Sequence, residues 1–492
     1  MTNSRIPWGP DTLGPTSKEA AAETWQYWQN RINRASLVML SEQKILSREQ
    51  TKKIAEAQRE AEKELNAPGA VPIFDIMPLE KLLIKHCGQE ATLIHTGRSR
   101  QDIFATLNQA RLRRAVIDTF DELNKLRKQL LSIAECHAET WMPAYTNGVQ
   151  AMPITLGFYL WAFLESFERD AARLKEAWVR VNQCALGSGV LACSAWPLSR
   201  ERLAELLGFD APIINGLDSS QVSLFDIPLE AASIASNIAV RITVLIQDLA
   251  QQYSQTRPWI MLDDSDAYGS SAMPQKRNPG ILNKTRARAS DVIGATTTAF
   301  FRAHNLNLGM YDNKESVLED NAKVFSLTVS MLALTTQAFS MLRVNKERAL
   351  EELENDWTCT MALAEALQMH YKVPFRVGHN FASDVVSKGR KNGWLPKNIP
   401  FETVQKSYEE ITEKLEGKAQ QLPLSEQEFR GYLAPENVVR SRVGTGAPSP
   451  LSTSKNLVSI AKQLAQDEFW LNKKKQDLSE AAIKLDAEFS KL

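Results

Sequence analysis

The residues from 100 to 142 form an unusually long stretch without any Gly or Pro. Apolar side chains such as Val116, Phe120 and Leu123 recur in it at the spacing of one helix face. A helix over this stretch would be roughly 65 Å long at 1.5 Å per residue, which exceeds an ordinary globular helix. A chain with such a stretch is therefore expected to build a bundle of long helices.

Further long helix-like stretches follow, whereas strand-like alternation of apolar and polar residues is scarce. We predict long helices over residues 153–182, 225–255, 281–302 and 315–342. Two helices over 16–66 and a short one over 78–87 precede them, and a final polar helix follows a Gly- and Pro-rich break at 444–450. The sequence thus predicts an all-α fold with a central bundle of about five long helices.

The chain has 492 residues, 43% of them hydrophobic, which is enough for a large core and for two or three domains. Changes in helix length suggest boundaries near residues 98 and 345. We therefore expect an N-terminal helical domain over 1–98, a central bundle over 99–345 and a C-terminal helical domain over 346–492.

The amino-acid composition argues against nucleic-acid, membrane and metal partners. With 58 basic and 58 acidic residues the net charge is +0, so no basic field favours nucleic acid and no charge run predicts a membrane-surface helix. Residues 1–14 lack the apolar core of a signal peptide, and no apolar run is expected to span a bilayer. The five Cys and six His are scattered, so we expect reduced, buried thiols, a cytoplasmic location and neither metal nor cofactor.

The stretch from 269 to 280 reads Gly-Ser-Ser-Ala-Met-Pro-Gln-Lys-Arg-Asn-Pro-Gly, which is too polar for a core and too constrained for a linker. Gly269 frees the backbone for a hinge or a close approach. Pro279 stands where the next predicted helix begins, and a helix start offers unpaired N–H groups to an anion. We interpret the stretch as a loop that holds a nucleophile or base beside a carboxylate-binding cradle.

Two more polar breaks interrupt the helices. Residues 95–102 read His-Thr-Gly-Arg-Ser-Arg-Gln-Asp, in which Arg98 and Arg100 are forks for a carboxylate and the intervening residues are neutral hydrogen-bonding groups. Taken alone, these arginines could equally pair with surface acids. The break at 142–157 reads Met-Pro-Ala-Tyr-Thr-Asn-Gly-Val-Gln-Ala-Met-Pro-Ile-Thr-Leu-Gly.

These three breaks resemble the motifs of a known family. The loop at 269–280 is similar at every fixed position to the Gly-Ser-Ser-x-Met-Pro-x-Lys-x-Asn-Pro signature of the fumarase/aspartase superfamily. The break at 95–102 resembles the His-Thr-Gly-Arg-Ser-Arg-Asn-Asp motif of argininosuccinate lyases, with Gln101 in place of Asn. The third resembles Pro-Gly-Tyr-Thr-His-Leu-Gln-x-Ala-Gln-Pro-Ile-Thr-Leu-Gly in frame.

The resemblance implies a three-domain homotetramer whose subunits share a helix bundle, with each active site built from the three breaks of three different subunits. It implies that Ser270 is the catalytic base and that Lys276 and Asn278 bind a substrate carboxylate. It also implies substrate-binding roles for Ser99, Arg100, Gln101, Thr146, Asn147 and Tyr311. The reaction would release fumarate from an N-substituted aspartate, without a cofactor.

Two departures concern the acid side of such a reaction. Asn147 stands where the family has His, and Asn283 stands where it has the Glu that orients this His. An Asn side chain hydrogen-bonds a substrate but donates no proton as an acid. Unless another group supplies the acid, the leaving group must carry its own proton, as an alkylamine does at neutral pH.

Other departures concern the leaving-group side. Tyr311 is kept, but Ser316 and Glu319 replace the Gln and Lys that hold the arginine half in the family. Val149 and Met152 replace two Gln, and residues 217–223 lack an Asp and an Arg. Argininosuccinate is thus the default substrate by resemblance, and another aspartate-derived amine competes with it. A catalytically silent relative and a hydratase or cycloisomerase of the same fold stay open as alternatives.

Overall fold

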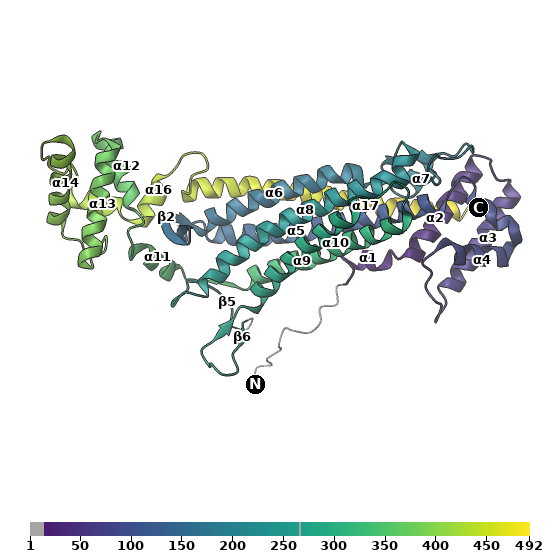
Figure 1. Cartoon of the computed structure of the whole chain (residues 1–492), viewed down its shortest axis with the longest axis horizontal. Helices are drawn as coiled ribbons and strands as arrows, with labels where there is room; N and C mark the ends of the chain where they lie inside the picture. The colour runs from purple at the N-terminus through teal and green to yellow at the C-terminus, as the bar shows by residue number, and fades with distance from the viewer. Residues whose placement is uncertain (1–13, 265–266) are drawn as a thin grey trace.

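The computed structural model describes residues 14–264 and 267–492, and it confirms the predicted all-α fold. Long helices lie side by side in an elongated bundle, with a helical region at each end (Figure 1). The bundle helices are α5 (Arg100–Cys136), α6 (Leu156–Val181), α8 (Ser223–Gln252), α9 (Gly280–Ala303), α10 (Tyr311–Ser340) and α17 (Pro450–Phe489). The first five match the long stretches predicted from the sequence.

Apolar faces hold the bundle together. Phe120 of α5, Phe167 of α6 and Phe339 of α10 are among its fully or almost fully buried side chains. Burying such a side chain contributes roughly 1.5–3 kcal/mol. A charged group also lies in this core, since the Arg127 guanidinium donates to an Asp467 carboxylate oxygen at 2.7 Å with both side chains almost fully buried.

The last helix belongs to more than one region. Leu457, Leu464 and Leu471 of α17 lie in the core of the bundle, whereas Leu485 and Phe489 lie in the core of the N-terminal region. The division of the chain at residues 98 and 345 stays a prediction. The sequence pattern placed α17 in the C-terminal domain over 346–492, whereas α17 packs in the cores of the bundle and of the N-terminal region.

The N-terminal region consists of short helices with their own core. They are α1 (Lys18–Ala22), α2 (Trp25–Glu42), α3 (Arg48–Leu65), α4 (Ile76–Cys87), the 3₁₀ segment η1 (Gly88–His95) and α7 (Arg200–Leu206). A capping box begins α3, because Ser47 Oγ accepts from the Gln50 N–H and Gln50 Oε1 accepts from the Ser47 N–H. This region packs against the first turns of α5, where one predicted motif lies.

The C-terminal region is a separate small core around Phe381, Tyr408 and Phe429. Its helices are α11 (Lys346–Glu354), α12 (Thr360–Tyr371), α13 (Phe375–Asn392), α14 (Phe401–Glu416), α15 (Glu426–Tyr432) and α16 (Pro435–Ser441). It lies at the end of the bundle opposite to the N-terminal region (Figure 1).

The predicted boundary at residue 142 is wrong, since α5 ends at Cys136 and a β-hairpin follows. Strand β1 (Trp141–Thr146) pairs antiparallel with β2 (Val149–Thr155). Asn147 and Gly148 form its turn with φ of +53° and +74°. An Asn-Gly pair is a strong signal for a two-residue hairpin turn, and the sequence interpretation overlooked it.

Three smaller strand pairs complete the fold among the described residues. β3 (Gln183–Cys184) pairs with β4 (Ala211–Pro212), and β5 (Ile260–Leu262) pairs with β8 (Leu342–Val344). The third pair, β6 (Tyr268–Gly269) with β7 (Arg277–Asn278), brackets the signature loop. A π-helical turn, η2 (Asp218–Val222), leads into α8.

Two expectations from composition need correction. The helical segments over 218–252 and 317–340 are long and apolar enough to cross a membrane by length and composition alone. Half of the most apolar window of each is buried inside the chain, which fits the core helices of a soluble protein. Of the five free cysteines, Cys136 and Cys193 are exposed rather than buried.

Candidate active site

The signature loop is a short hairpin that projects from the side of the bundle, near the label β6 in Figure 1. Tyr268 pairs with Asn278 and Gly269 with Arg277, so the residues between them form its tip. Helix α9 begins at Gly280, directly after Pro279, as the sequence predicted. The loop therefore presents its polar residues away from the core of its own chain.

Ser270 sits inside this tip with two donors directed at its oxygen. The backbone N–H groups of Ala272 and Met273 donate to Ser270 Oγ at 3.3 Å and 3.1 Å. Two converging N–H dipoles stabilise negative charge on an oxygen, and a serine acting as a base requires such stabilisation. This is the local geometry that a serine acting as a base would need.

The two expected carboxylate ligands of the loop are placed differently. Lys276 is exposed, and its ammonium forms no ion pair within the described part of the chain. The Asn278 amide instead donates to the Tyr268 carbonyl at 3.1 Å and so closes the base of the hairpin. Lys276 thus offers its ammonium to a ligand, whereas the Asn278 side chain fixes the base of the loop.

The break at 95–102 leads into α5, where Ser99 is the N-cap residue. Asp102 closes a capping box, because its Oδ1 accepts from the Ser99 N–H at 2.8 Å. Its Oδ2 accepts from the N–H groups of Gly187 and Gly189 at 2.9 Å and 3.0 Å. Burial raises the pKa of Asp102 to about 6, although these hydrogen bonds oppose the shift. Asp102 therefore fastens the turn at 187–189 to the start of α5.

The two arginines of this break have different surroundings. Arg98 is buried and donates to Ser36 Oγ and Asn33 Oδ1, each at 2.8 Å. Burial lowers its pKa to about 10. The expectation that Arg98 binds a substrate carboxylate is therefore not supported, because its donors already face α2. Arg100 is mostly exposed and pairs with Asp75 on the surface, which is the alternative that the sequence left open.

Gln101 and the facing helix α10 offer further polar groups. Gln101 Oε1 is buried and has no hydrogen-bond partner among the described residues. Lys314 of α10 is fully buried and donates to the Ser220 carbonyl and to Gln221 Oε1. Burial lowers the pKa of Lys314 to about 8. The sequence interpretation missed Lys314, since a single Lys within a helix gives no signal of burial. The side chains of Tyr311 and Ser316 lie outside the described residues.

Thr146 and Asn147 lie exposed at the tip of the β1–β2 hairpin. Glu352 of α11 holds this hairpin from behind, since its Oε1 accepts from Gln150 Nε2 at 2.6 Å and from the Tyr145 hydroxyl at 3.3 Å. The hairpin thus presents these two residues away from the bundle while its base is anchored. Asn283 is exposed on the first turn of α9.

A single chain does not bring the three breaks together. Ser99 and Thr146 lie beyond opposite ends of α5, a 37-residue helix, which separates them by roughly 55 Å at 1.5 Å per residue. The signature loop projects from the bundle between these ends (Figure 1). Within the described residues the predicted site is therefore three separate patches.

Comparisons with known proteins agree with the motifs. A lyase family model matches residues 17–294. The chain is 30% identical to the argininosuccinate lyase of Ehrlichia ruminantium (strain Welgevonden), over 84% of this chain and 87% of that protein. It is 32% identical to the argininosuccinate lyase of Methanocorpusculum labreanum, over 79% of this chain and 77% of that protein.

Solved structures give the same result. The chain is similar to EDDS lyase in complex with formate, with a TM-score of 0.86 and 25% identity over 97% of this chain and 95% of that chain. A fumarate lyase from Mesorhizobium sp. BNC1 shares the fold, with a TM-score of 0.70 and 18% identity over 92% of this chain and 99% of that chain. Together with the motifs, these likenesses support a fumarate-lyase type of activity. The chain belongs to the fumarase/aspartase superfamily as an argininosuccinate lyase-like member, and it is a carbon–nitrogen lyase.

Proposed function

We propose that the enzyme eliminates fumarate from an N-substituted aspartate, with Ser270 as the base. Ser270 Oγ takes a proton from the carbon next to a carboxylate, the electrons of that C–H bond form the new C=C bond, and the C–N bond breaks with its electrons on nitrogen. The observation that carries this proposal is the pair of N–H groups directed at Ser270 Oγ. They stabilise the alkoxide that proton abstraction requires.

The intermediate of this elimination is a doubly charged, enolate-like carboxylate. Lys276 supports its stabilisation, because its exposed ammonium is not engaged with any acid of the described chain. Asn278, the loop N–H groups and the start of α9 add neutral donors at the same tip. Two paired strands of two residues each hold the base of the loop, so the loop is a small unit that can close over a substrate.

The complete site requires other copies of the chain. Because α5 keeps Ser99 and Thr146 roughly 55 Å apart, a substrate reaches all three patches only where subunits bring them together. We therefore propose a homotetramer in which Ser99, Arg100, Gln101 and Tyr311 come from one subunit, Thr146 and Asn147 from a second and the Ser270 loop from a third. Exposed apolar side chains on bundle helices, such as Val240, Val244 and Phe469, suit the faces that would meet.

This composite site can be tested by mixing inactive variants. Co-refolded or co-expressed Arg100→Met and Ser270→Ala chains should regain part of the wild-type activity, because some sites then contain both intact residues. Each variant alone, at the same total concentration, is the control. A fully active monomer, shown by light scattering on the assayed sample, would contradict the composite site.

The amine half of the substrate is the second part of the proposal. Argininosuccinate is supported by the argininosuccinate lyases among the relatives, and release of arginine would place the enzyme in arginine biosynthesis, in the cytoplasm. Another aspartate-derived amine is supported by the likeness to EDDS lyase and by Ser316 and Glu319. Incubation with fumarate and a panel of amines, arginine included, should give an N-substituted aspartate that mass spectrometry detects.

The same assay separates the alternatives. No adduct with any amine, together with no fumarate from argininosuccinate, would contradict the proposed function. Malate formed from fumarate without an amine would indicate a hydratase instead. Ser270→Ala serves as the control for any product that does not depend on the site.

A further inference from the structure

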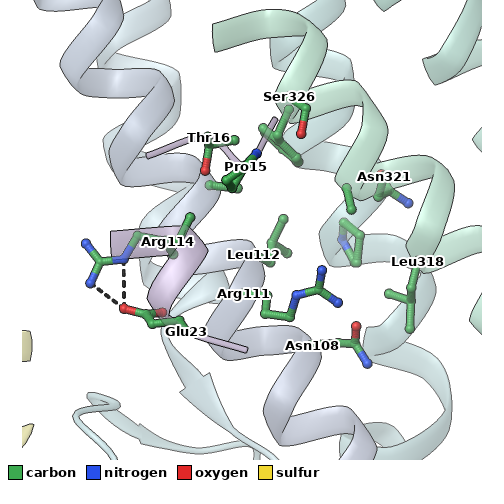
Figure 2. A pocket seen from close by; sticks show the side chains of 15 residues that line it. Pro15, Thr16, Glu23, Asn108, Arg111, Leu112, Arg114, Leu318, Asn321 and Ser326 are labelled. Atoms are coloured by element: carbon green, nitrogen blue, oxygen red, sulfur yellow. Dashed lines mark hydrogen bonds and ion pairs between the residues drawn. The ribbon is translucent and has the colours of Figure 1, made fainter. Parts of the chain in front are cut away.

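A cavity of about 120 Å³ opens between the chain entering α1 and helices α5, α8 and α10 (Figure 2). Its walls are mostly apolar, with Leu112, Leu318 and Phe325 among them. A few polar side chains enter it from α5 and α10, as in many small-molecule sites. None of the family motifs includes these residues.

The cavity lies along the same seam as the expected leaving-group residues. Asn108, which lines it, follows Gln101 by seven residues on α5, so the two lie on one helix face about two turns apart. Across the seam, Leu318 lines the cavity next to Glu319, where the family keeps a Lys for the arginine half. The cavity therefore shares the seam between α5 and α10 with the residues expected to hold the leaving group.

Arg111 is the cation of this cavity that forms no ion pair among the described residues, although the charge of Glu319 acts on it. Figure 2 shows its side chain directed from α5 toward α10, between Asn108 and Asn321. Within the part of the chain that the structure describes, its guanidinium forms no hydrogen bond and no ion pair. Arg111 is an exposed residue overall, and the burial of part of its side chain lowers its pKa, which the Glu319 carboxylate opposes. Arg114, by contrast, is neutralised by Glu23 at 2.6 Å.

Asn321 supplies a second, independent signal. Its side chain is only 3% exposed, its Nδ2 donates to the Val317 carbonyl, and its Oδ1 is buried with no donor among the described residues. An unpaired buried acceptor costs roughly 1–3 kcal/mol, so a ligand N–H or O–H that reached it would gain affinity. Asn108 likewise donates its Nδ2 to the Phe104 carbonyl, and no hydrogen bond to its Oδ1 is made within the described part of the chain.

We propose that this cavity receives the far end of the leaving amine and selects for a carboxylate there, with Arg111 as its partner and Asn321 as the acceptor for a neighbouring N–H or O–H. This inference rests on the proposed function. It adds Arg111 and Asn321 as specificity-determining residues for the amine. It also accounts for Glu319, since a cation on the facing helix replaces the Lys that this position has in the family.

The test compares matched amines that differ only in the carboxylate, in the addition of an amine to fumarate. Arginine is compared with agmatine, and 4-aminobutyrate with butylamine. The wild type should prefer the carboxylate-bearing member of a pair by about tenfold or more in kcat/KM, as for a charge-assisted hydrogen bond. Arg111→Met should remove this preference through KM, whereas Arg111→Lys should restore part of it.

Arg376→Met is the matched control, because Arg376 is an exposed arginine of α13 that also forms no ion pair with any described residue. It should leave the preference unchanged. If wild type forms adducts but shows no carboxylate preference, or if Arg111→Met slows both members of a pair equally, the inference is overturned and the proposed function stands. If no amine forms an adduct with wild type, the proposed function fails and this inference falls with it.

Discussion

The two best-matching motifs of this chain differ in what surrounds them. In the signature loop, Ser270 and Lys276 face away from their own core and keep their chemical groups available. In the break at 95–102, the Arg98 guanidinium and the Asp102 carboxylate are buried and form hydrogen bonds with other groups of the same chain. A polar motif residue thus belongs to the site or to its scaffold according to burial, and residue type alone does not distinguish these roles.

The largest effect should come from the exposed motif. Ser270→Ala should reduce kcat by roughly 100-fold or more, as for loss of a general base, without lowering Tm, because the hydroxyl lies on an outward-facing loop. Ser271→Ala, one residue along and exposed, is the matched control and should keep most of the activity. A Ser270→Ala enzyme with more than about a tenth of wild-type activity would show that Ser270 is not the base.

The two arginines of the break at 95–102 should differ in what their loss affects, stability for Arg98 and activity for Arg100. Arg98→Met should destabilise the fold by roughly 2–5 kcal/mol, because Asn33 and Ser36 lose a buried charged donor. Arg100→Met should leave Tm within about a degree, since an exposed ion pair contributes little. It should lower kcat/KM by roughly 100-fold, as for loss of a hydrogen bond to a charged substrate group, which makes it nearly inactive in the mixing experiment. Thermal unfolding and steady-state kinetics on both variants check this, and the reverse pattern would contradict the division.

A smaller effect is expected at Asp102. In wild type, both Asp102 carboxylate oxygens accept hydrogen bonds from backbone N–H groups. In the Asp102→Asn variant, an NH₂ group faces one set of these donors, so the free energy of unfolding should fall by roughly 1–3 kcal/mol near neutral pH. Asp121→Asn, on an exposed ion pair with Lys475, is the control and should change stability much less.

The pH dependence of stability follows from the same carboxyl. Its pKa is raised to about 6 by burial, so the folded state binds this proton more tightly than the unfolded state. The stabilising contribution of protonation is therefore lost as pH rises from about 4 to 6. In scans of Tm against pH, the advantage of wild type over Asp102→Asn should shrink across this window. An advantage that grows with pH would contradict the raised pKa.

The smallest effect is an absence in the rate profile. Burial and the Arg98 charge lower the pKa of His95 to about 3, whereas its Nε2 lies 2.9 Å from a Glu80 carboxylate oxygen, which favours the charged form. With Asn at 147 and 283, we expect no imidazole limb near pH 6.5 in wild type, whereas Asn147→His combined with Asn283→Glu should introduce one. If Asp102→Asn removes a limb from the pH–rate profile, that limb reports the titration of the Asp102 carboxyl. If substitution of a native histidine removes a limb, the mechanism without a general acid is contradicted.

The long helices were readable from the sequence because long stretches with apolar residues at the spacing of one helix face, and few Gly or Pro, have few other ways to fold. The start of α9 after Pro279 and the capping box of α3 were also readable, because they depend on neighbouring residues only. The end of α5 was not, since strand pairing of Trp141 with Thr155 competes with helix propensity there. Even so, the Asn147-Gly148 turn gave a local signal for it.

By itself, the sequence determined the all-α class, the superfamily and the signature loop with Ser270 in it, because these depend on local periodicity and on residue order. Only the tertiary structure decided which polar residues are scaffold. It buried Arg98 against α2 and Asp102 against the turn at 187–189, and it left Asn321 Oδ1 buried beside a cavity with no donor among the described residues. Burial depends on elements far apart in the chain packing together, and spacing within one segment carries no record of that packing.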